Sequence, residues 1–138
     1  MGDFATGGCL CAAVRYRCAE APVMTGCCHC RDRQRATGAA FPTLVIFTKG
    51  TVSVDGDALA MRSSVGDSGK TVTRGHCAEC GSPVLVDYDV TPDFTAVMAG
   101  TLDDPALVEP KWCIYTASKQ PWVELPAGLK IYQGGFGG

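Results

Sequence analysis

The stretch "HCAECGS" (His76–Ser82) carries two cysteines three positions apart, with a glycine directly after the second. Near the start of the chain, "GGCLC" (Gly7–Cys11) carries another pair two positions apart. A structural zinc ion binds four ligands in a tetrahedron, and sites made of four cysteine sulfurs are common. Residues i and i+2 of an extended segment point the same way, so both members of a pair can reach one ion. The spacing therefore predicts a structural zinc site at Cys9, Cys11, Cys77 and Cys80.

Such a site would join an early and a late segment of the chain, and small β domains gain much stability from a metal of this kind. The competing interpretation is that these are buried free cysteines, which behave as small apolar side chains. The two tight spacings and the polar neighbours His76 and Glu79 favour zinc. His76 itself should face away from Cys77 in an extended chain, so we do not expect it to be a ligand.

Length and composition restrict the classes of protein to which this chain can belong. The 138 residues fit one domain, and 46% hydrophobic with 19% charged residues is ordinary for a globular protein. A net charge of −2 gives no basis for binding nucleic acid or an acidic membrane. We find no secretory signal and no apolar stretch long enough to span a bilayer. Nine cysteines without a signal favour metal or thiol chemistry over disulfides, so we expect a cytoplasmic protein.

Short β-rich segments, separated by glycine and proline, dominate the chain. They cover residues 13–18, 43–50, 51–57, 70–77, 82–90, 94–100, 111–117 and 129–135. One short helix is predicted over Arg31–Ala36, ending at Gly38, and residues 102–110 could hold another single turn. This pattern predicts a mainly-β sandwich or tent and not a βαβ fold. We expect one domain over residues 1–138, with a core over 7–132 and a flexible glycine-rich tail over 133–138.

A second cysteine set lies in "TGCCHCRDRQRATGAAF" (Thr25–Phe41). A C-x-C-x-x-C metal motif that begins at Cys28 and continues with Cys30 would close at position 33, but this position is Arg33. An arginine side chain stays protonated and cannot ligate a cation. Two thiolates alone rarely hold zinc well, so a second zinc site here would be incomplete.

Five motifs resemble, in order and spacing, those of the glutathione-dependent formaldehyde-activating (GFA, centromere protein V-like) family. They are "GGCLCAAVRY", "CCHCRDRQRATGAAF", "HCAECGSPV", "AGTLDDP" and "TASKQPW". The resemblance runs from Gly7 to Tyr132. It implies an Mss4-like β-tent fold with few short helices, two zinc sites, and carbon–sulfur lyase activity on a thiol adduct such as S-hydroxymethylglutathione. The family's structural zinc falls on the four cysteines that spacing alone predicts.

The family's catalytic zinc is held by a C-H-C-x-x-C motif, whose first two cysteines correspond to Cys28 and Cys30. Its third ligand corresponds to Arg33. Cys113 stands where the family often has histidine, and Cys27 is additional. Either could complete a rearranged site, although Cys27 should point away from Cys28 in an extended segment.

Three interpretations of the second set stay open. In the first, zinc binds through Cys28 and Cys30 with a substitute ligand, and the protein makes or breaks a carbon–sulfur bond. In the second, only the structural zinc remains, and the pocket binds a small molecule without metal chemistry, or binds nothing. In the third, Arg33 lowers the pKa of a neighbouring thiol and creates a thiolate for redox work.

The arginines of this stretch, Arg31, Arg33 and Arg35, are interpreted first as a solvated helix face. The functional alternative is that one of them clamps a carboxylate or phosphate of a thiol-bearing substrate such as glutathione. We assign substrate binding to Arg33 and to Phe41, the aromatic residue nearest in sequence to the second set.

Two further features of the sequence receive no functional assignment. Trp112 and Trp122 are expected to be core aromatics. "GDSG" (Gly66–Gly69) resembles a serine-protease signature, but nothing around it supports a triad. The sequence thus predicts a GFA-type Zn²⁺ protein with catalytic Cys28 and Cys30, acting on a small thiol-containing molecule such as a glutathione conjugate.

Overall fold

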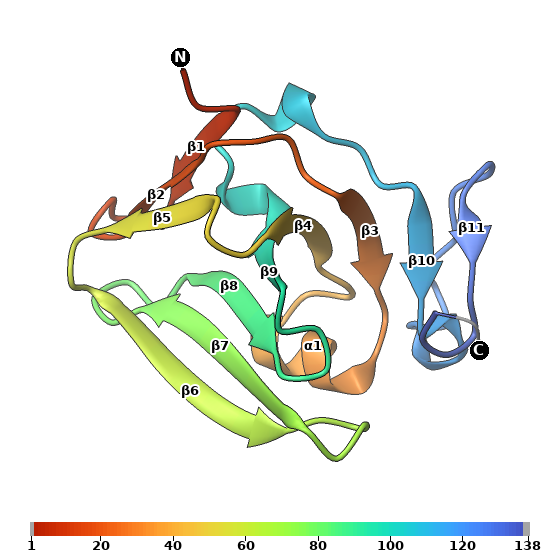
Figure 1. The fold of residues 1–138 in the computed structure, drawn as a ribbon. Helices are drawn as coiled ribbons and strands as arrows, with labels where there is room; N and C mark the ends of the chain where they lie inside the picture. Colours follow the sequence, from red (N-terminus) through yellow and green to blue (C-terminus); the bar gives the residue numbers. More distant parts are fainter. Residues whose placement is uncertain (1, 137–138) are drawn as a thin grey trace.

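Short β-strands provide most of the regular structure in the computed structural model, which describes residues 2–136 (Figure 1). The strands are β1 (Ala5–Gly8), β2 (Arg15–Cys18), β3 (Met24–Cys28), β4 (Thr43–Thr48), β5 (Val52–Asp55), β6 (Leu59–Val65), β7 (Thr71–Cys77), β8 (Pro83–Tyr88), β9 (Phe94–Met98), β10 (Trp112–Ile114) and β11 (Lys130–Ile131). The helical elements are α1 (Arg31–Thr37) and the 3₁₀ turns η1 (Ala99–Thr101), η2 (Pro105–Leu107) and η3 (Thr116–Ser118). The predicted mainly-β class is confirmed.

The strands form two sheets. The smaller has the order β1-β2-β5, and the larger has the order β11-β10-β3-β4-β9-β8-β7-β6. All pairings are antiparallel except that β10 runs parallel to both β3 and β11. In Figure 1 the small sheet lies beside one end of the large sheet, and α1 lies below β3 and β4. The large sheet therefore carries the second cysteine set at the end of β3 and half of the first set at the end of β7.

One hydrophobic core joins the small sheet to the large one. Tyr16 from β2 and Phe47 from β4 are both fully buried in it, and burial of such a side chain contributes about 1.5–3 kcal/mol. The Tyr16 hydroxyl hydrogen-bonds the Thr101 hydroxyl at 2.7 Å, which satisfies its polar end. Cys9 and Cys77 belong to the same cluster, so this core brings the first cysteine set together.

A second core lies under β3, β4 and β10. Its buried members include Cys28, Leu44, Trp112 and Ile114. Trp112 stacks over Gly26 of β3, where the parallel register pairs these two residues. The end of β3 is thereby fixed against β10. Cys28, its last residue, and Cys30, two residues later, are therefore held by a rigid strand.

Most predicted strand segments are confirmed, but β1, β3 and β6 were not predicted. The sequence of β1 is "ATGG", and its glycines resemble a turn. A side chain at Gly7 would overlap the Tyr16 hydroxyl, so this strand needs glycine for tertiary reasons. The strand β6 is exposed over Met61–Val65, so it lacks the alternation by which strands are recognised.

The predicted helix and turn are also confirmed. The helix α1 extends to Thr37 and ends at Gly38, whose φ of 72° is the left-handed conformation that glycine adopts readily. The predicted single turn in residues 102–110 is η2, which Asp104 caps through its carboxylate. One core assignment is wrong: Trp112 is buried as predicted, but Trp122 is 70% exposed.

No helix within residues 2–136 is long and apolar enough to cross a membrane. The flexible tail predicted for 133–138 includes residues 137–138, which lie outside the described residues. Before them, the Gly134 carbonyl accepts a hydrogen bond from the Tyr115 N–H at 2.7 Å. The Phe136 ring lies 4.8 Å from that of Trp112.

We predict that Gly26→Ala destabilises the protein by about 1–3 kcal/mol, because the new methyl group would overlap the buried indole of Trp112. Gly100→Ala is the matched control, since nothing lies near its Cβ position, and it should change stability by less than about 0.5 kcal/mol. Urea unfolding followed by tryptophan fluorescence measures both. Equal stability of the two variants would contradict the packing of β10 on β3.

Candidate metal centre and thiol cavity

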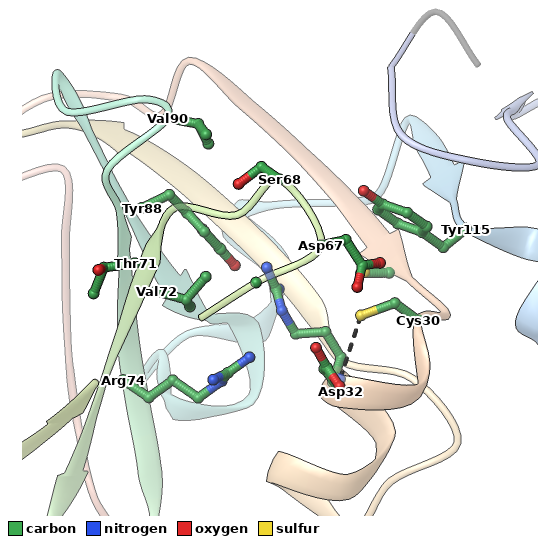
Figure 2. A pocket seen from close by; sticks show the side chains of 13 residues that line it. Cys30, Asp32, Asp67, Ser68, Thr71, Val72, Arg74, Tyr88, Val90 and Tyr115 are labelled. Carbon is green, nitrogen blue, oxygen red and sulfur yellow. Dashed lines mark hydrogen bonds between the residues drawn. The ribbon is translucent and has the colours of Figure 1, made fainter. Parts of the chain in front are cut away.

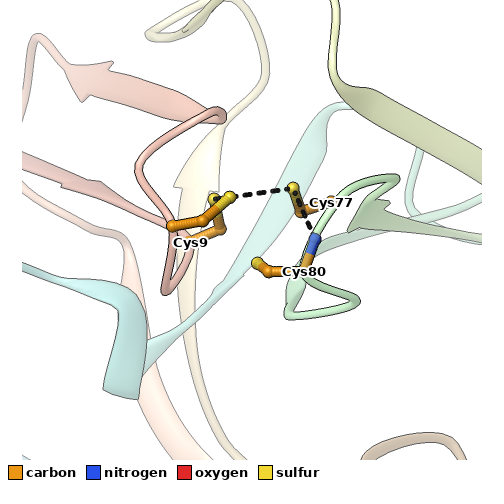
Figure 3. A group of neighbouring side chains, drawn as sticks. Cys9, Cys77 and Cys80 are labelled. Atoms are coloured by element: carbon orange, nitrogen blue, oxygen red, sulfur yellow. Dashed lines mark hydrogen bonds between the residues drawn. The ribbon is translucent and has the colours of Figure 1, made fainter.

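Four cysteines from two loops converge at one end of the molecule. Cys9 and Cys11 lie between β1 and β2, Cys77 ends β7, and Cys80 lies in the turn before β8 (Figure 3). Their four sulfur atoms all lie within 4.8 Å of one another. We call this set the four-cysteine cluster. The structure thus brings together the four residues that the spacing predicted, and His76 lies outside the set, as expected.

Backbone N–H groups point at the sulfurs of the cluster. The N–H of Val14 donates to Cys9 Sγ at 3.2 Å, and the N–H groups of Glu79 and Cys80 donate to Cys77 Sγ at 3.4 Å each. Gly81 follows with a φ of 81°, which turns the chain back toward β8. Such donors stabilise thiolates, the form of cysteine that binds a metal.

Ser82 supports the cluster through its hydroxyl group, a role that the cysteine spacing does not predict. Its hydroxyl lies 3.2 Å from Cys80 Sγ. Hydrogen bonds from the Ser82 side chain and backbone lower the pKa of Cys80 to about 5. The Leu10 N–H donates to the same hydroxyl at 3.2 Å, so Ser82 also links the two cysteine loops.

The second cysteine set lies where β3 passes into α1. Cys28 is the last residue of β3, and Cys30 is the N-cap of α1. The Cys30 sulfur accepts a hydrogen bond from the Arg33 N–H at 3.3 Å, as an N-cap side chain does (Figure 2). Both cysteines line a cavity of about 130 Å³ that we call the thiol cavity.

The two thiols of this cavity have opposite pKa shifts. A hydrogen bond from the Cys28 side chain lowers the pKa of Cys30 to about 6, and the Arg33 N–H and guanidinium act in the same direction. The same bond between thiols, together with burial, raises the pKa of Cys28. At neutral pH the pair therefore holds one thiolate at Cys30 and one thiol at Cys28.

The prediction that the three arginines of α1 form a solvated helix face is wrong for Arg33. Its side chain is only 7% exposed, whereas Arg31 and Arg35 are exposed as predicted. The Arg33 guanidinium carbon lies 4.8 Å from the centroid of the Tyr88 ring. The reason is geometric, because the first turn of α1 faces β7 and β8, and position 33 is on that side.

Several residues that line the thiol cavity were not predicted as site residues from the sequence. Arg74 comes from β7, Tyr88 ends β8, and Tyr115 follows β10 with a φ of 55°. A left-handed conformation at a non-glycine residue is strained, and such strain concentrates at functional sites. Asp67 and Ser68, from the rejected "GDSG" stretch, also line the cavity (Figure 2). The pairing of β6, β7 and β8 places all of these residues except Tyr115 beside Cys30, and Tyr115 is placed there by β10, which pairs with β3.

Other predicted residues lie elsewhere. Phe41 does not line the thiol cavity, and its ring lies 4.6 Å from that of the buried His29. Cys27 pairs in register with Cys113 on the neighbouring strand, and both are buried.

A second metal site lacks a third ligand in the described part of the chain. Within residues 2–136, the four-cysteine cluster is the one group of three or more histidine, cysteine or acidic ligands that could hold an ion. Neither Cys27 nor Cys113 joins Cys28 and Cys30 in such a group. Arg33, at the position where the resemblance implies a third ligand, lines the same cavity with its cation. These residues fit a four-cysteine metal site and do not fit a second one.

Comparisons with known proteins agree with this fold. A family model described as "glutathione-dependent formaldehyde-activating enzyme" matches residues 4–118. Among solved structures, the chain is similar to a protein from Rhodobacter sphaeroides, determined as a structural genomics target. The two share 20% sequence identity with a TM-score of 0.58, and the match covers 76% of this chain and 96% of the other. No curated protein matches this chain.

We predict that, in zinc-loaded protein, iodoacetamide labels Cys30 before every other cysteine outside the four-cysteine cluster. The thiolate is the reactive form, so the rate should rise as pH increases through about 6 and level off above pH 7. At pH 7 the reaction should be about two- to threefold faster than that of an ordinary thiol, because the higher thiolate fraction outweighs the lower nucleophilicity. Peptide mapping after timed labelling gives the rate at each site. Cys30→Ser should remove the fast reaction, and a rate still rising through pH 8–9 would refute the assignment.

Proposed function

The chain belongs to the glutathione-dependent formaldehyde-activating enzyme family, and from this premise we propose that it is a zinc protein that cleaves or forms the carbon–sulfur bond of a small thiol adduct. The single observation that carries the proposal is that two thiols, Cys28 and Cys30, line one cavity together with a buried arginine, Arg33. The four-cysteine cluster would hold the zinc, and the thiol cavity would perform the reaction without a metal of its own.

The geometry of the four-cysteine cluster supports zinc. Zinc–sulfur bonds of about 2.3 Å in a tetrahedron separate the sulfurs by about 3.8 Å. The Cys9 and Cys11 sulfurs lie 3.7 Å apart, and the Cys11 and Cys77 sulfurs lie 3.8 Å apart. Four thiolates are soft ligands that select zinc over magnesium or calcium. The ion would then cross-link the β1–β2 loop to the β7–β8 turn and would have a structural role.

The lowered pKa of Cys30 supports a role as a base near neutral pH, and Cys28, which stays protonated, is the thiol that lines the cavity beside it. In a thiol–aldehyde adduct, RS–CHR′–OH, the Cys30 thiolate would take the hydroxyl proton. The carbon–sulfur electron pair would leave with the RS sulfur as the C=O bond forms. The Cys28 thiol would protonate that sulfur. A proton passing from Cys30 to Cys28 would then restore both groups.

This sequence of steps is balanced and involves no oxidation. The adduct gives one thiol and one aldehyde, and the reverse reaction forms the adduct. Arg33 contributes its N–H and its charge to the Cys30 thiolate. We propose that Arg33 also binds substrate, whereas the position of Phe41 outside the cavity supports a role in packing against His29.

The metal proposal predicts about one zinc per chain in protein purified without chelator. Cys77→Ser should lose the zinc and unfold at lower temperature, because three sulfurs would remain in the cluster. Cys18→Ala is the control, since Cys18 is equally buried but lies outside the cluster, and it should keep its zinc. Elemental analysis and thermal melting measure both effects. Two zinc ions per chain would show that the thiol cavity binds metal after all.

The catalytic proposal predicts that Cys30→Ser lowers turnover of a formaldehyde–thiol adduct by about 10²–10⁴-fold, the usual contribution of a positioned base. Serine is a preferred N-cap, so this variant should remain folded. Arg35→Gln, an exposed change on the same helix, is the control and should leave turnover unchanged. Release of formaldehyde gives the rate. Undiminished turnover by Cys30→Ser would exclude this mechanism, and no turnover by the unmodified protein would favour a non-catalytic relative with structural zinc.

Thiol-redox chemistry is the second candidate, and the same neighbouring thiols favour it. It predicts a disulfide between Cys28 and Cys30 after mild oxidation, whereas the lyase proposal needs both sulfurs reduced. Adduct turnover that survives only in reducing buffer would support the lyase. Disulfide reductase activity without adduct turnover would support the redox function.

A further inference from the structure

The thiol cavity contains an unusual set of buried polar atoms. Within residues 2–136, Arg33 Nη1, Arg74 Nε and the Tyr88 hydroxyl are buried and have no hydrogen-bond partner, and all three residues line this cavity. Buried polar groups in native proteins are nearly always paired, and each unpaired one costs about 1–3 kcal/mol. Three such groups around one space indicate a ligand that supplies acceptor atoms.

Charge restricts that ligand further. The Arg33 side chain is more than nine-tenths buried, and neither Arg33 nor Arg74 forms an ion pair with any described residue. Arg74 makes one side-chain hydrogen bond, from its guanidinium to the Ser64 hydroxyl at 2.8 Å. Both arginines remain protonated, and the one thiolate at Cys30 offsets only one of their two charges. The donor atoms that stay unpaired on these two cations therefore fit an anionic acceptor.

The surroundings favour a carboxylate over a more highly charged oxyanion. Asp32 and Asp67 also line the cavity, and their negative charges would repel a dianion such as phosphate. The forked donors of a guanidinium match the two oxygens of a carboxylate. The Tyr88 ring, 4.8 Å from the Arg33 guanidinium carbon, holds this group over its face.

The volume sets the size of the bound group. A cavity of about 130 Å³ approaches the roughly 150 Å³ that accommodates a benzene-sized molecule. It can therefore hold a carboxylate with a few further atoms, whereas a larger conjugate would insert only its carboxylate end. Cys30 lines the same space, so the atoms attached to that carboxylate would lie close to the thiol pair.

We propose that the thiol cavity binds the carboxylate of a compact, monoanionic acid through Arg33, Arg74 and Tyr88, and that the thiol or adduct carbon of this acid faces Cys30. The carboxylate site stands on its own, whereas the identity of the reacting group rests on the proposed lyase function. The cation of Arg33 thus serves an anionic substrate at the position where the family pattern would supply a zinc ligand.

Titration calorimetry with mercaptoacetate tests the site directly. Mercaptoacetate should bind at least tenfold more tightly than its uncharged methyl ester, and more tightly than inorganic phosphate. Arg33→Gln and Tyr88→Phe should each weaken mercaptoacetate binding about tenfold, and Arg35→Gln should not change it. Tyr88→Phe removes only one oxygen, so it tests the site even where Arg33→Gln fails to fold. Zinc content and melting temperature confirm the folding of each variant.

Three results would overturn the carboxylate site. They are equal binding of the ester, tighter binding of phosphate, and unchanged mercaptoacetate affinity in the folded variants. Failure of the lyase function gives a different result, namely Arg33-dependent binding of mercaptoacetate without turnover of any adduct. The opposite case is a lyase whose KM is the same for adducts with and without a carboxylate and does not change in Arg33→Gln. That result would support the lyase function and contradict the carboxylate site.

Discussion

The rest of the structure depends on the meeting of two cysteine loops that are far apart in sequence. The β1–β2 loop belongs to the small sheet and the β7–β8 turn to the large one, and their four sulfurs lie within 4.8 Å of one another. The hydrophobic core around Tyr16 and Phe47 lies between the same two sheets. A metal ion at this point would add a cross-link to that core, which matters in a chain whose strands are mostly four to seven residues long.

The same large sheet carries the thiol cavity, and the charge of one residue dominates its chemistry. Arg33 stands where the family resemblance implies the third ligand of a second zinc, and its cation is buried beside two thiols. A cation at this point excludes a metal by repulsion but stabilises a neighbouring thiolate and attracts an anion. The proposed loss of the metal and the proposed carboxylate binding therefore have one physical cause, which is the charge of Arg33.

The predictions from sequence succeeded where local patterns suffice. The helix that begins after Cys30 and ends at Gly38 follows from capping and from the left-handed φ of glycine. The four-cysteine cluster follows from two short spacings. The strand β1 and the exposed Trp122 were missed or misassigned, because each depends on what lies beside it in the folded chain. The roles of the predicted site residues remain predictions, although Cys28, Cys30 and Arg33 do share one cavity.

The sequence by itself determined the mainly-β class, the family and the four cysteines of the candidate metal centre, because these depend on short spacings and on local periodicity. Only the tertiary structure decided which side of α1 is buried, so that Arg33 and not Arg35 enters the cavity. It also decided that Arg74 and Tyr88 lie opposite Cys30. These residues come from strands far from Cys30 in sequence, and the register of β7 and β8 that aligns them is set by packing over the whole sheet.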